Sequence, residues 1–523
     1  MANKIYPISL SGIEKIGIEK FMKNYYIPVT AIEYQDIYKK VHSSYIENIN
    51  QHNDEFVYWI AIANIKIIRS VSNYILEILQ LQRLIEKGYE YIINEEKRKI
   101  TDYIREGNYS SLSNINLTGK HMSRLRFQER VKNILKTIKY NLNPHVLTNF
   151  SSPVFFIGNR SQQEVVAYCN QNKIEPIRLS PMLFANNSYE KVNKDSKLNE
   201  ILEFVYSFFV LLKKQFPEIN SSLFELLKKE VEECFLWSLL FFRHNLRIFS
   251  TLKYKSLFAT GLGNEPHRLF CSSWRYAGGE VTGFVHGNAF CNCYNSLYIN
   301  ELSLVDKYIT GSIGQEEILN DVAIKFSQGL KMPKISHQRN NNYIEVFKKH
   351  QAGNVVHKVS KVMIVGFPVV DYMFFDIPDG NALSHFQVEL RLMKILKEAG
   401  YYVQYNSHPV TSSSINNYFI RLADEVIIDK FEDNYIKADC LLFGNHTTTT
   451  FGFSLLTNKP MVLLNSKGTL WYPRAFELIK KRCSVVEAES VDGKIVFDEQ
   501  DMLNAIECSL ENIDYEILHE FAF

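Results

Sequence analysis

The chain has 523 residues, too many for one ordinary hydrophobic core, and this length predicts two or three domains. Hydrophobic residues at 46% and charged residues at 22% exclude a chain that is mainly disordered or collagenous. With 59 basic and 57 acidic residues the formal net charge is +2, so no global field favours nucleic acid as a partner.

Residues 1–150 are predicted to form a helical module, because apolar residues recur at helical spacing through 56–84 and breakers are few. The first 15 residues lack the apolar segment of a secretory signal, and the most apolar stretches of the chain are too short to span a bilayer. The eight cysteines are scattered without zinc-site spacing, which favours reduced thiols. We therefore expect a cytoplasmic protein.

A basic amphipathic helix is predicted within 120–139, where an apolar stripe recurs at i, i+4, i+7 and i+11 from position 127. Arg126, Arg130 and Lys132 belong to the basic residues that crowd its other faces. They are candidates for contact with an anionic glycan or with the inner-membrane surface as a peripheral protein. A solvated helix face explains the same pattern.

Residues 151–325 are predicted to form a first Rossmann-like domain. An apolar run at 153–158 precedes a helical segment and a second strand, and a long helical stretch covers 196–247. A strand at 256–260, a helix at 266–277 and a strand at 281–285 follow. This alternation predicts a parallel sheet that binds ligands at the carboxyl ends of its strands.

The polar, poorly periodic residues 326–357 are predicted to be an interdomain linker, and residues 358–497 a second Rossmann-like domain. Its strands are expected at 362–365, 402–405, 425–428, 440–443 and 461–464. A capping box of Ser384 and Gln387 is expected to begin its first helix. Residues 498–523 are predicted to contain a C-terminal helix.

The first chemical constellation follows the strand at 256–260. Gly261 and Gly263 allow close backbone approach to a ligand, but the third glycine of a dinucleotide fingerprint is absent. Glu265, at the mouth of the next helix, is a candidate general base or an acid that only favours the helix dipole. His267 and His286 are weaker candidates, and a structural hydrogen bond explains a lone histidine equally well.

The second constellation follows strands of the second domain. Ser407 and His408 come directly after one strand, Gly366 follows another, and Asn445 follows a third. Asn445 and His446 precede a run of four hydroxyl side chains, Thr447, Thr448, Thr449 and Thr450. Hydroxyls beside the free N–H groups of a helix suit a phosphate without a metal, although N-capping alone also explains them. His408 could add charge or a proton there and is therefore a further catalytic candidate.

These motifs resemble the donor-binding half of GT-B glycosyltransferases over about 255–470. The resemblance rests on the His-Pro pair, the segment ADCLLF, the threonine run and the segment NKPMVLLN, which ends at Asn465. The nearest likeness is to capsule and lipopolysaccharide transferases that use CMP-activated Kdo, sialic acid or other nonulosonic acids. The resemblance implies that the His-Pro pair and the hydroxyl motif hold the nucleotide phosphate.

We therefore expect an α/β protein of GT-B architecture, with two Rossmann-like domains and an N-terminal helical module. The expected activity is metal-independent transfer of a sugar from a nucleotide donor, most simply CMP-linked, to a bacterial surface glycan or glycolipid. No cofactor beyond this co-substrate is expected, and the absence of a D-x-D motif fits a site without a metal. A nucleotide-sugar epimerase and a non-catalytic glycan-assembly protein remain open alternatives.

Overall fold

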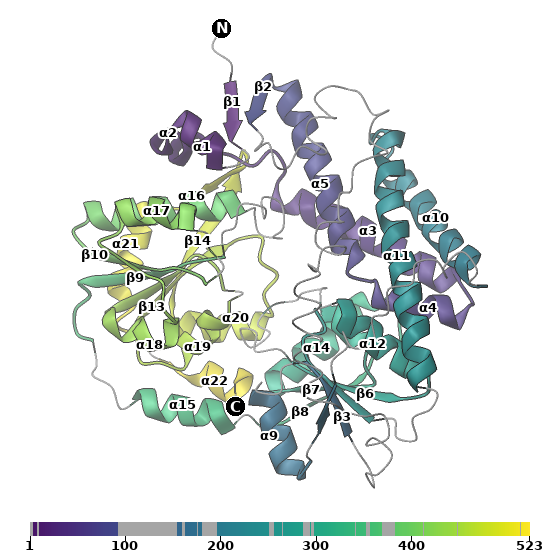
Figure 1. Cartoon of the computed structure of the whole chain (residues 1–523). Coiled ribbons are helices and arrows are strands. Elements are labelled where there is room, and N and C mark those ends of the chain that lie inside the picture. Colours follow the sequence, from purple (N-terminus) through teal and green to yellow (C-terminus); the bar gives the residue numbers. More distant parts are fainter. Residues whose placement is uncertain are drawn as a thin grey trace.

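The computed structural model is a mixed α/β fold with two large, mainly parallel sheets and many helices (Figure 1). Five residues singled out above lie outside the described part of the chain: Arg126, Arg130, Lys132, His286 and Thr447. The described residues are 4–7, 10–92, 154–158, 163–174, 176–179, 196–249, 256–263, 265–285, 293, 298–339, 341–351, 356–368, 382–409, 411, 413–446, 448–512 and 514–522.

Helices predominate at the N-terminal end of the chain. They are α1 (Leu10–Ile16), α2 (Ile18–Asn24), α3 (Ala31–Gln51), α4 (Glu55–Ala63) and α5 (Ile67–Glu86), flanked by the parallel strands β1 (Lys4–Pro7) and β2 (Tyr89–Ile92). A capping box begins α3, where the Thr30 hydroxyl accepts from the Glu33 N–H and the Glu33 carboxylate accepts from the Thr30 N–H. In α5 the buried residues include Ile68, Val71 and Ile75, which form one helical face.

Helices α3, α4 and α5 share a hydrophobic core with the first large sheet, whereas α1 and α2 pack into the core of the second large sheet. Helix α3 packs against α5 and α10 (Leu198–Gln215), whereas α4 packs against α11 (Ser221–Phe249) and α12 (Glu265–Tyr276). Figure 1 shows α3, α4 and α5 beside α10 and α11. Helices α3, α4 and α5 therefore bring their side chains close to the loops of the first large sheet.

The first large sheet has six strands, all parallel, in the order β4-β3-β5-β6-β7-β8. The strands are β3 (Val154–Ile157), β4 (Ile177–Arg178), β5 (Ser256–Ala259), β6 (Glu280–Phe284), β7 (Lys307–Thr310) and β8 (Lys334–His337). Its further helices are α9 (Gln163–Asn172), α13 (Ile299–Leu302) and α14 (Ile313–Phe326). Buried apolar residues in its central strands explain why short runs here form strands without a polar face.

The segment 326–357, predicted to be a linker, contains regular structure. Strand β8 pairs with β7 at the edge of the sheet, and α15 (Asn341–Gln351) follows it. The prediction missed β8 because an edge strand of sequence KISH buries one residue well, Ile335, and so lacks an apolar run.

The second large sheet has seven strands in the order β11-β10-β9-β12-β13-β14-β15, with β15 antiparallel. The strands are β9 (Lys361–Val365), β10 (Tyr402–Asn406), β11 (Glu425–Ile427), β12 (Cys440–Phe443), β13 (Met461–Ser466), β14 (Ser484–Val491) and β15 (Lys494–Val496). The helices are α16 (Ala382–Glu398), α17 (Ser413–Leu422), α18 (Phe431–Asn434), the 3-10 turn η8 (Tyr435–Lys437), α19 (Thr449–Leu455), α20 (Pro473–Arg482), α21 (Glu499–Cys508) and α22 (Glu516–Phe521).

The predicted capping box at the start of α16 is wrong. The helix already includes Ala382, so Ser384 lies within it, and the Gln387 amide donates instead to the Met22 carbonyl at 2.7 Å. The C-terminal helix α21 begins as its sequence suggests, because the Asp498 side chain accepts from the Asp501 N–H.

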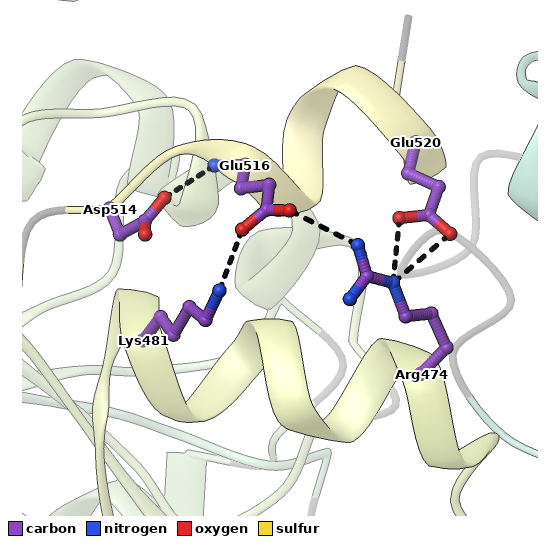
Figure 2. A network of polar contacts seen from close by, with 5 residues as sticks. All are labelled: Arg474, Lys481, Asp514, Glu516 and Glu520. Carbon is purple, nitrogen blue, oxygen red and sulfur yellow. Dashed lines mark hydrogen bonds and ion pairs between the residues drawn. The ribbon is translucent and has the colours of Figure 1, made fainter.

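Helix α22 connects the parts of the molecule that hold the two large sheets. Figure 2 shows Arg474 and Lys481 of α20 paired with Glu516 and Glu520 of α22, with Lys481 to Glu516 at 2.7 Å. On its other side α22 packs against α14, where a Cβ on Gly314 would lie 2.5 Å from the Phe521 ring. Glycine is therefore required for this close approach.

Within the described residues, no helix is both long enough and apolar enough to cross a membrane. The cysteines of that part of the chain are thiols rather than disulfides.

Candidate functional site

The loop after β5 places Glu265 at the first position of α12. Gly261 adopts a φ of +64°, which a side chain would strain, and it lets the chain turn from strand to helix. The loop is held from outside by two cations, because Lys66 Nζ and Arg268 Nη1 each donate to the Gly263 carbonyl at 2.8 Å. Lys66 is a contribution of the N-terminal helices that sequence analysis missed.

Glu265 has a carboxyl group with unusual proton affinity. Burial raises its pKa to about 7, while the charges of Arg268 and Lys66 and a hydrogen bond with Ser238 act in the opposite direction. Its Oε1 is buried and has no hydrogen-bond partner among the described residues. A carboxylate with a pKa near neutral pH and one unused oxygen is suited to proton transfer.

His267 has a hydrogen-bond partner in its own loop. Its Nδ1 lies 3.2 Å from the Thr260 carbonyl, and burial lowers its pKa, so the neutral ring braces the loop beside Gly261. Of the two described candidates for a base, Glu265 is the better placed chemically.

The predicted nucleotide-binding segments meet at one edge of the seven-stranded sheet. Strand β9 lies between β10 and β12, and Val365 is paired with both Asn406 and Phe443. Gly366, Ser407 and Gly444 each follow one of these residues, so the three loops leave the sheet at the same level. The carboxyl edge of a parallel sheet is where such loops converge on a ligand.

One side chain of the loop after β10 forms a hydrogen bond within the protein. The Ser407 hydroxyl donates to the Asn416 side chain of α17 at 2.8 Å. His408 is half-buried, and burial lowers its pKa, so its ring is mainly neutral at pH 7. We expected charge or a proton from His408, and the lowered pKa leaves it chiefly as a neutral hydrogen-bonding group.

The threonine run after β12 begins a short helix. The Thr448 hydroxyl accepts from the Phe451 N–H at 3.2 Å and from the Thr450 hydroxyl at 2.8 Å, so it caps α19. Thr449 is exposed and Asn445 is buried. The capping interpretation therefore holds for Thr448, and the hydroxyl of Thr449 stays accessible.

Gly366 is required by packing against its own sheet. A Cβ here would lie 2.3 Å from the Tyr405 hydroxyl and 2.9 Å from the Asn406 carbonyl. Beneath it Glu389 is fully buried, accepting from the Phe367 N–H at 2.7 Å and from the Tyr405 hydroxyl at 2.9 Å. Burial raises the pKa of Glu389 to about 8.

A contact that sequence analysis missed joins the two large sheets. Cys293, which follows β6, has its Sγ 3.1 Å from Nε2 of His446, which follows β12. The backbone of Cys293 also forms an antiparallel bridge with Trp471, whose ring lies against the His446 ring. Residues 153 positions apart leave no local signal, although His446 stands next to the threonine run that the sequence analysis examined.

No known protein-family model matches this chain, and no curated protein matches it either.

Proposed function

We propose that the chain is a metal-independent glycosyltransferase of GT-B architecture, with two Rossmann-like domains built on the two large sheets. The observation that carries the proposal is the Cys293–His446 contact, because it links a residue that follows β6 of the first sheet to the predicted phosphate turn of the second. A cleft between two such sheets suits a donor on one side and an acceptor on the other.

The donor in this proposal is a nucleotide sugar, most simply a CMP-linked nonulosonic acid or Kdo. The loops that follow β9, β10 and β12 would hold it, with hydroxyl, backbone N–H and imidazole donors around the phosphate. These groups stabilise the departing nucleotide phosphate without a metal ion. His408 and Thr449 are the described side chains best suited to this role.

The acceptor would be a bacterial surface glycan or glycolipid, approached from the six-stranded sheet. Glu265 would take the proton of the acceptor hydroxyl as that oxygen forms the new glycosidic bond and the nucleotide leaves. Its pKa of about 7 gives a useful fraction of carboxylate near neutral pH, and Oε1 is unused by the protein.

The test begins with nucleotide binding by the full chain. CMP, UDP and GDP are titrated by calorimetry with and without EDTA, and thermal melting is followed in parallel. We expect one nucleotide to bind equally well with EDTA, and a ligand at 100 times its dissociation constant stabilises by about 2.7 kcal/mol. Loss of binding on chelation would contradict the metal-independent site, and absence of all binding would contradict the function.

Turnover then separates this activity from its alternatives. The nucleotide sugar whose nucleotide binds is incubated alone and with glycan acceptors, and products are followed by mass spectrometry and NMR. Transfer that depends on acceptor supports the proposal. Conversion of the sugar without acceptor would identify an epimerase instead.

A further inference from the structure

The side chains of Cys293 and His446 form a hydrogen-bonded pair between the two large sheets. Cys293 is half-buried, and only 6% of the His446 surface is exposed. The Sγ to Nε2 distance of 3.1 Å is the one hydrogen bond that His446 forms with the described residues. A thiol and an imidazole at this distance share one proton, so its position decides what His446 can do.

The protonation state follows from burial. Burial lowers the pKa of His446 to about 3, so the ring is neutral at pH 7. A neutral imidazole has one donor and one acceptor nitrogen. When the thiol donates in such a neutral pair, Nε2 accepts and the ring proton lies on Nδ1.

Trp471 fixes the plane of the ring. Its centroid lies 4.2 Å from that of His446, and its Nε1 donates to the Asn465 side chain at 2.8 Å. Its other neighbour is Phe476, stacked at 4.9 Å. The backbone of Cys293 also pairs with that of Trp471, so His446 is contacted by residues from both parts of the molecule.

We infer that Cys293 is a positioning residue that keeps His446 in the Nδ1–H tautomer, so that His446 donates a neutral hydrogen bond to the phosphate of the nucleotide donor. This inference rests on the proposed function and names a further ligand of the same site. His446 belongs to the turn between β12 and α19, beside Asn445 and the threonines. Because Cys293 comes from the opposite side, donor binding is coupled to the approach of the two sheets.

The test compares three variants of the full chain. Cys293→Ala removes the thiol, Cys293→Ser retains a donor, and Cys508→Ala removes an exposed thiol elsewhere as a control. Calorimetry with CMP and UDP should show an affinity about tenfold lower for Cys293→Ala, substantial recovery for Cys293→Ser and no change for Cys508→Ala. Melting temperatures verify that each variant is folded.

The tautomer of His446 provides a second measurement, which would not change if Cys293 had a purely structural role. In protein labelled with ¹⁵N-histidine, the His446 resonances are assigned by their loss in His446→Asn. The wild type should show the proton on Nδ1, and Cys293→Ala should shift the ring toward the other tautomer.

The outcomes separate the two proposals. If the wild type binds a nucleotide and Cys293→Ala binds it equally well, the positioning role is wrong and the proposed function stands. A wild-type His446 protonated on Nε2 also overturns the inference. If the wild type binds neither CMP nor UDP, then both the His446–phosphate contact and the CMP-linked or UDP-linked donor are wrong.

Discussion

Replacing Glu389 by glutamine should change the pH dependence of stability. Glu389 is 2% exposed, and burial raises its pKa from 4.5 to about 8. Between these values the folded chain keeps a proton that the unfolded chain releases, so the free energy of unfolding falls as pH rises. At about 1.4 kcal/mol for each pH unit, the loss amounts to about 5 kcal/mol above pH 8. Glutamine preserves the acceptor for the Phe367 N–H and has no ionisation, so the variant should lack this loss.

The assay is urea and thermal unfolding of the wild type and Glu389→Gln between pH 5 and pH 9. The difference between the two proteins cancels the titration of other groups. We expect it to move by several kcal/mol in favour of the variant as pH rises. Glu398→Gln, at an exposed position of the same helix, is the matched control. A difference that stays constant within about 1 kcal/mol over this range would refute the reasoning, because Glu389 would then not hold its proton in the folded state.

Three further predictions concern the site and its support. Glu265→Gln should reduce the rate of transfer by about 10²–10⁴ while the calorimetric nucleotide affinity is unchanged. Wild-type transfer should rise as pH increases through about 7, and a fully active variant would remove Glu265 from catalysis. Gly366→Ala should lower the free energy of unfolding in urea melts by about 1–3 kcal/mol, because its Cβ clashes with Tyr405. The control Gly444→Ala, with no atom within 4 Å of its new Cβ, should leave the free energy of unfolding almost unchanged, and equal effects would contradict the packing argument. Arg482→Met should lower the free energy of unfolding by more than about 2 kcal/mol in the same melts, because the buried guanidinium donates to carbonyls at the end of α19. Unchanged stability would show that these carbonyls find other donors.

The regular elements of the two large sheets could be predicted where local signals are strong. The strand, helix and strand over 256–285 were expected within about one residue, because apolar runs alternate there with turns that contain glycine. Strand β8 was not predicted, because an edge strand forms without an apolar run. Gln387 carries the pattern of a capping box, but its amide satisfies carbonyls at the end of α2, a tertiary contact that no local pattern reveals.

For the candidate site too, local features could be predicted from the sequence and contacts between distant residues could not. The loops that follow β9, β10 and β12 could be placed at one edge from the sequence, because parallel strands share a carboxyl end. The role of Thr448 as a cap was one of two local alternatives, and its hydroxyl does accept from the Phe451 N–H. Lys66, Cys293 and His446 could not be assigned, because their roles depend on neighbours that are far away in the sequence.

Burial acts in opposite directions on the two titratable groups that frame the proposed cleft. It raises the pKa of Glu265 to about 7 and lowers that of His446 to about 3. Both changes favour the neutral form, yet only Glu265 changes charge near pH 7. If the proposed roles are correct, donor affinity should therefore stay level between pH 6 and pH 8, while the rate of transfer follows the ionisation of Glu265. A level donor affinity combined with a transfer rate that rises through pH 7 would support binding at the seven-stranded sheet and proton removal at the six-stranded sheet without any mutation.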